Sequence, residues 1–100
     1  MKTKFKIGKL VSTSGVDELM KKDQQFAVFV FDSLKRYVNC DWGDLCKDDK
    51  EMNKHAVKSG EERIFASYDH PSDEKLNIWI ITDSSPLDRR VTTILFPSEY

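Results

Sequence analysis

The chain of 100 residues has the length of one typical domain, and its composition, 39% hydrophobic and 33% charged, is that of a folded globular protein. Sixteen basic and seventeen acidic residues give a net charge of −1, which argues against the overall basic footprint of a nonspecific nucleic-acid binder. No apolar run approaches the roughly 20 residues of a membrane span, and the start, MKTKFKIGKL, lacks the apolar core of a signal peptide. A cytoplasmic protein with free thiols at Cys40 and Cys46 is therefore expected, and no membrane partner.

The first sixty residues predict one strand and three helices. Loose alternation over Lys4 to Ser12 indicates a strand, and Thr13 or Ser14 can cap a short helix that ends near Lys22. Apolar residues then recur at helical spacing from about Gln24 to Asn39. The turn Asp41-Trp42-Gly43-Asp44 follows, and Asp44 is expected to cap a polar helix from about Leu45 to Ser59 that ends at Gly60.

From Arg63 onward the apolar period changes from helical to two. The segments RIFASYDH, KLNIWIITD and RRVTTILFP predict three strands joined by polar turns, in an antiparallel unit. Alternation places Trp79, Ile81, Ile94 and Phe96 on one face of the sheet, and Ile78, Ile80 and Leu95 on the other. We expect helices to cover one face and the N-terminal segment or another chain, for example in a homodimer, to cover the other.

These elements predict a single α+β domain over residues 1–100, in the order β-α-α-α-β-β-β, with an antiparallel sheet of about four strands packed against about three helices. The chain is expected to be folded to its last residues. The ring of Tyr100 should pack against the domain, for example beside the Asp41-Trp42-Gly43-Asp44 turn.

No arrangement of residues typical of catalysis is found. Cys40, Cys46, His55 and His70 lack the spacing of zinc ligands, and nothing pairs either thiol with a histidine. The acidic residues between Asp41 and Glu51 are interleaved with lysines, as on a solvated helix, and no glycine-rich phosphate loop occurs. The sequence therefore predicts a protein that is not an enzyme and that has neither a metal site nor a cofactor.

Five segments in order, CDWGDL, KDDKEMNKHAV, ERIFASY, IWIITD and VTTILFPSEY, resemble a family of small proteins encoded on bacterial plasmids, integrative elements and phages. The likeness covers about Gly8 to Tyr100. The chain departs from the family pattern directly after IWIIT, where a longer loop from Asp83 to Arg90 replaces a tight acidic-arginine turn. The resemblance implies an accessory protein of a mobile genetic element. Because such accessory proteins often antagonise host defence, the resemblance also implies, by association, a role in counter-defence.

The expected function is therefore stoichiometric binding to a host defence protein or nucleoprotein complex, as an anti-CRISPR or anti-restriction inhibitor. Trp42 is expected either to fill the end of the core or to protrude with its acidic neighbours and contact a basic surface of the partner. Trp79 is expected either in the core or on a binding surface. The alternative is a protein that sequesters a nucleotide signal between sheet and helices through Arg63, Trp79, Asp88 and Arg89. An enzyme of undescribed type is a third alternative. The candidate binding residues are Asp41, Trp42, Asp44, Asp48, Trp79, Asp88 and Arg89.

Overall fold

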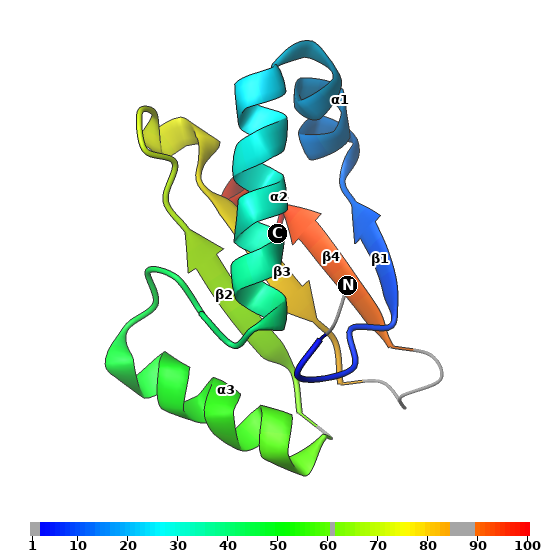
Figure 1. Ribbon diagram of the computed structural model, residues 1–100, viewed down its shortest axis with the longest axis vertical. Helices are drawn as coiled ribbons and strands as arrows, with labels where there is room; N and C mark the ends of the chain where they lie inside the picture. Colours follow the sequence, from blue (N-terminus) through cyan, green and yellow to red (C-terminus); the bar gives the residue numbers. More distant parts are fainter. Residues whose placement is uncertain (1–2, 61, 85–89) are drawn as a thin grey trace.

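The computed structural model describes residues 3–60, 62–84 and 90–100 and confirms one compact α+β domain with the predicted order of elements (Figure 1). Its helices and strands are β1 (Lys9–Ser12), α1 (Ser14–Lys22), α2 (Gln24–Val38), α3 (Lys47–Ser59), β2 (Ile64–Tyr68), β3 (Ile78–Thr82) and β4 (Val91–Leu95). Short 3₁₀-helices occupy Glu74–Leu76 and Pro97–Glu99. None of the helices in the described residues is long and apolar enough to cross a membrane.

The sheet is mixed, with the strand order β1-β4-β3-β2. The three C-terminal strands pair antiparallel, as predicted. The first strand, however, lies parallel to β4, so the sheet is not wholly antiparallel. A parallel neighbour needs a long connection, which the three helices and two further strands between β1 and β4 supply.

The helix boundaries follow from capping chemistry. The Thr13 side chain accepts a hydrogen bond from the backbone of Val16 at the start of α1, and Asp23 accepts two from the first turn of α2. Gly60 ends α3 in the left-handed conformation that glycine adopts readily. The predicted cap by Asp44 is wrong: α3 begins at Lys47, and its N-cap residue Cys46 makes no side-chain hydrogen bond to the helix.

The core lies between α2 and one face of the sheet. From the helix it takes Phe26, Val30, Leu34 and Tyr37, all buried. We call the sheet face toward α2 the helix face. Its buried side chains in the core are those of Ile64, Ala66, Tyr68, Ile78, Ile80 and Ile94. Burial of these apolar side chains is the main stabilising contribution to a domain of this size.

The strand register corrects the predicted faces. Trp79 lies opposite Leu95, and Ile80 opposite Ile94. Residues directly opposite each other share a face, so Ile94 belongs with Ile80 on the helix face, whereas Leu95 belongs with Trp79. We call the latter the outer face; it carries Phe65, Ser67, Trp79, Ile81, Thr93 and Leu95. A shift of one residue in the register of a strand exchanges its two faces.

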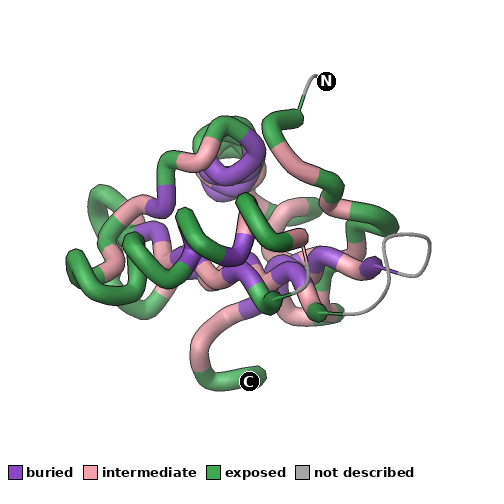
Figure 2. The backbone as a smooth tube through the Cα atoms, turned by 90° about the horizontal axis from the view of Figure 1, so that it is seen from below, coloured by how far each residue is buried: buried purple, intermediate pink, exposed green. Residues whose placement is uncertain are grey.

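The described N-terminal segment, from residue 3 onward, and the C-terminal residues lie on opposite sides of the sheet (Figure 2). At the N-terminus, the Lys4 amide bonds to the carbonyl of Val38, and Phe5 packs against Tyr37 and Trp42. The N-terminal segment therefore covers the end of the core on the side of α2 and not the outer face, contrary to one of the two predicted covers. The 3₁₀-helix Pro97–Glu99 leads to Tyr100, which packs on Trp79 of the outer face, and so the C-terminal residues are folded as predicted.

Candidate functional site: an aromatic cluster on the open sheet face

Trp42, one of the two tryptophans predicted as binding residues, is part of the core. Its side chain is only 6% exposed, and its ring lies 5.5 Å from the ring of Tyr37 and 5.7 Å from that of Phe5. Of the two predicted roles, the structure thus favours the indole that closes the end of the core. A ring so deeply buried presents almost no surface to a partner.

Asp41 serves the same turn. Its carboxylate accepts hydrogen bonds from Arg36 Nε at 2.8 Å and from the amide of Gly43 at 3.1 Å. These bonds, chiefly the one from Arg36, hold the pKa of the Asp41 carboxyl below its usual range, and the same pair raises the pKa of Arg36. The Asp41 carbonyl also accepts a hydrogen bond from the Tyr68 hydroxyl at 2.6 Å. Asp41 is thus already engaged within the domain.

Asp44 and Gly43 anchor the turn to β2. The Asp44 amide donates to the carbonyl of Ser67 at 2.7 Å, and its side chain accepts from the amide of Asp69 at 2.9 Å. Gly43 has φ +70°, and a Cβ atom there would collide with the Ser67 carbonyl. Asp41, Trp42 and Asp44, which were predicted as part of a binding patch, therefore hold the turn against the edge of the sheet. The fourth predicted member of the patch, Asp48, lies in α3 and is exposed.

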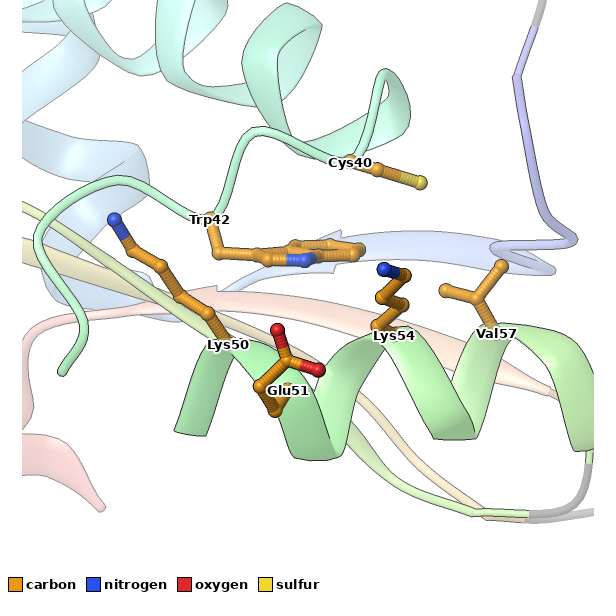
Figure 3. Close-up of a pocket in the computed structure, with 6 residues that line it drawn as sticks. All are labelled: Cys40, Trp42, Lys50, Glu51, Lys54 and Val57. Carbon is orange, nitrogen blue, oxygen red and sulfur yellow. The ribbon is translucent and has the colours of Figure 1, made fainter. Parts of the chain in front are cut away.

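A pocket of about 360 Å³ separates Trp42 from α3, whose Lys50, Glu51, Lys54 and Val57 line it together with Cys40 (Figure 3). Two lysines beside an indole suggest an anionic aromatic ligand. Stacking of such a ligand, however, requires an accessible ring face, and Trp42 is 6% exposed. The pocket therefore does not provide a stacking site.

The second predicted tryptophan, Trp79, lies at the centre of an aromatic group on the outer face. Its ring meets the ring of Phe65 edge to face at 5.0 Å and that of Tyr100 at 5.5 Å. Arg63 Nη1 donates to the Tyr100 hydroxyl at 2.7 Å. We call these four residues the Trp79 cluster. Trp79 and Phe65 are half-buried and Tyr100 is 72% exposed, so solvent reaches the cluster.

The cluster borders two hollows. One, of about 160 Å³, is lined by its own four members. The other, of about 430 Å³, shares Arg63 and Phe65 and continues along α3 past Met52, with Asp49 and Glu62 among its lining residues. The outer face thus offers apolar rings beside a groove with carboxylates on its wall.

The structure brings together only part of the predicted site. Trp79 and Arg63 meet in the cluster, whereas Asp41, Trp42 and Asp44 lie in the turn beside β2. The predicted positions Asp88 and Arg89 lie outside the described residues. Sequence analysis missed Phe65 as a site residue and placed Tyr100 beside the wrong tryptophan. Alternation with Ile64 did indicate that Phe65 faces away from the core, which could have identified it.

Sequence analysis placed Arg90 at the end of the loop that begins at Asp83 and gave it no role in the fold. It is 3% exposed and donates to the carbonyls of Lys6 and Gly60 at 3.0 and 2.6 Å, which joins the N-terminal segment to the end of α3. It is a structural residue.

Within the described ranges, no three histidine, cysteine, aspartate or glutamate side chains lie close enough to hold a metal ion together. His55 lies 3.9 Å from Glu62 on the surface, and His70 accepts backbone hydrogen bonds from Ser72 and Asp73. Comparisons of the chain with family models, with curated proteins and with solved structures found no match.

Proposed function

We propose that the chain is a non-catalytic binding protein that acts stoichiometrically on a host defence protein or nucleoprotein complex and contacts it through the Trp79 cluster. The observation that carries the proposal is the arrangement of Phe65, Trp79 and Tyr100 on the sheet face that α2 does not cover, locked by the hydrogen bond from Arg63. The counter-defence context rests on the resemblance of the chain to proteins of mobile genetic elements.

The residue types support a protein partner. Tryptophan, tyrosine and arginine are the most frequent hot-spot residues of protein interfaces. The two aromatic types bury a large contact area at a low cost in conformational entropy. Rings that already contact one another lose still less on binding. The near-neutral chain, with net charge −1, gives no strong long-range field, so affinity would come from this local surface.

Sequestration of a nucleotide signal is the alternative function, and the cavity sizes favour it less. The hollow next to Arg63 and Trp79 has about 160 Å³, whereas small-molecule sites usually have about 300 to 1,000 Å³. The larger neighbouring hollow carries Asp49 and Glu62, which would repel a phosphate. Mass spectrometry of small molecules released from the denatured protein tests this alternative.

The proposal is tested by pulldown from host lysate with the wild-type chain, Trp79→Ala and the control Val28→Ala. Val28 is 54% exposed on α2, so its loss removes an exposed apolar side chain from the opposite side of the sheet. A protein retained by wild type and control but lost with Trp79→Ala supports the proposal, provided that circular dichroism shows an intact fold. Equal retention by all three variants contradicts it.

Stoichiometry separates binding from catalysis. Titration of the captured target should end near one chain per binding site, since the proposal includes no turnover. Inhibition at far below one chain per target would indicate an enzyme instead.

The predicted acidic patch around Asp44 and Asp48 is better tested without changing Asp44. Reversing Asp44 would remove its hydrogen bond to Asp69 and disturb β2. Asp48→Lys with Asp49→Lys changes two exposed carboxylates of α3 and leaves that bond in place. If this variant loses the target while Trp79→Ala keeps it, the contact lies on α3 and not on the Trp79 cluster.

A further inference from the structure

The two edges of the sheet differ in how the outward backbone groups of their strands are hydrogen-bonded. β2 forms one edge, and the side chain of Asn53 both accepts from the Phe65 amide, at 3.1 Å, and donates to its carbonyl. The next outward carbonyl, that of Ser67, accepts from the Asp44 amide. The β2 edge is thus closed by α3 and the turn before it, as Figure 1 shows.

β1 forms the other edge, at the right of Figure 1, and its outward backbone groups follow from its pairing. The amide of Lys9 donates to the carbonyl of Arg90, directly before β4, at 2.9 Å, and the amide of Thr13 donates to the carbonyl of Ile94 in β4, at 3.0 Å. Alternate residues of a strand direct their amides and carbonyls to opposite sides. Leu10 and Ser12 therefore direct theirs away from β4, to the side on which the described residues form no further strand.

Apolar side chains flank this edge. A hollow of about 190 Å³ runs between β1, α1 and α2 and is lined by Leu10, Met20 and Phe31 among others. Leu10 is 44% exposed and Phe31 is 54% exposed, and both stand on the helix side of the sheet. An open edge beside exposed apolar residues is the arrangement that strand addition uses.

We propose that the β1 edge binds the β1 edge of a second copy of this chain, antiparallel about a two-fold axis. The proposal is independent of the function proposed above. Pairing of Leu10 with Ser12 of the second copy, and the reverse, forms two hydrogen-bonded pairs and satisfies all four outward groups of each strand. Val11 then lies opposite Val11 of the second copy, at the two-fold axis.

A second copy fits this edge because the strand is self-complementary. In that register Lys9 lies opposite Thr13 of the second copy, so no like charges oppose each other along the strands. The net charge of −1 adds little repulsion between two copies. The axis also brings the two hollows lined by Leu10 and Phe31 to the same side of the joined sheets, with Leu10 of each copy next to the contact.

Joining the edges produces one continuous sheet from two four-stranded sheets. Both outer faces lie on the same side of it, because the axis is perpendicular to the sheet. The dimer therefore presents two Trp79 clusters in one direction.

Cross-linking tests the register. Val11→Cys, in a full-length background with Cys40→Ser and Cys46→Ser, places two thiols at the axis, where a non-hydrogen-bonded pair has Cα atoms about 4.5 Å apart. Mild oxidation should give a covalent dimer. The control Thr93→Cys lies on the same face one strand further in, between β1 and β3, and should stay monomeric. Equal cross-linking of the two variants overturns the proposed register.

Light scattering after size exclusion tests the dimer itself. The wild type should have twice the mass of one chain, and Ser12→Pro should have the mass of one chain, because proline lacks the outward amide and is tolerated at sheet edges. If Ser12→Pro does not fold, Phe31→Lys replaces it, since this exposed position tolerates charge in the monomer. A wild-type chain that stays monomeric up to about 100 µM overturns the proposal. Loss of a heterologous target, rather than of the dimer, in Ser12→Pro would also overturn it, in favour of a partner strand.

Discussion

The hydroxyl groups of Thr82 and Thr92 lie 2.7 Å apart on neighbouring strands, on the helix face of the sheet. Thr92 donates to the carbonyl of Ile7 at 2.7 Å, and Thr82 lies 2.7 Å from the hydroxyl of Tyr37. A chain of hydroxyls thus runs through the core from α2 to the N-terminal segment. Because every member is buried or partly buried, the loss of one leaves its neighbours without water to replace it.

We expect Thr82→Val to destabilise the domain, although valine has nearly the same shape. The substitution leaves the Tyr37 hydroxyl and the Thr92 oxygen each with one partner fewer, at a cost of about 1 to 3 kcal/mol. The melting temperature should fall by about 4 to 8 °C for each kcal/mol in a domain of this length. Thr93→Val, on the outer face, is the control and should change it little. Equal effects of the two substitutions would show that the hydroxyl chain contributes nothing specific.

Two glycines with nearly equal backbone angles should respond differently to alanine. Gly43 and Gly60 have φ +70° and +72°, so each alanine carries a left-handed penalty of about 1 kcal/mol. At Gly60, apart from its neighbours in the chain, no atom of the described residues lies within 4 Å of the new Cβ, whereas at Gly43 the Cβ would collide with the Ser67 carbonyl and the Tyr68 ring. Chemical denaturation should therefore show a clearly larger loss for Gly43→Ala. Similar losses would mean that the turn can move away from β2 without cost.

Deletion of residues 97–100 should lower the melting temperature by several degrees, as for a loss of roughly 1 kcal/mol. The deletion removes the Glu99 carboxylate, which accepts from Thr13 Oγ1 at 2.6 Å and from the Phe96 amide at 2.9 Å, and it uncovers the Trp79 ring. Tyr100→Phe is the milder control, because it removes only the hydroxyl that Arg63 contacts. Thermal melts and indole fluorescence measure both effects, and an unchanged melt of the truncated chain contradicts the packing of this end.

The Asp41 carboxylate should make stability depend on pH in the acid range. Its pKa in the folded protein is lowered, chiefly by the hydrogen bond from Arg36. The stabilisation is therefore complete above the ordinary aspartate pKa of about 3.9 and is lost as the pH falls through the lower folded value. Asp41→Asn should reduce the loss of stability below about pH 4, measured by denaturation at several pH values. Asp48→Asn, an exposed carboxylate on α3, is the matched control. An unchanged acid profile in Asp41→Asn would contradict this contribution.

The sequence by itself determined the elements and their order. Capping residues and apolar periodicity are local properties, and they predicted α2 nearly to its ends, the start of α1 at Thr13 or Ser14 and the stop of α3 at Gly60. Alternation in the last third predicted three antiparallel strands for the same reason. Of the candidate site, the sequence identified Trp79, Arg63 and the folded C-terminal end.

Only the tertiary structure decided which residues meet. The direction of β1 and the register that places Leu95 beside Trp79 depend on pairing between distant segments, which no local pattern specifies. The same holds for the contact of Tyr100 with Trp79 and for the burial of Trp42 against Phe5 and Tyr37. An aspartate in a turn with a tryptophan has the same local signature whether it binds a partner or the backbone of its own chain. For Asp44 the packing of this turn against β2 decided the second, because its carboxylate accepts a hydrogen bond from the distant amide of Asp69.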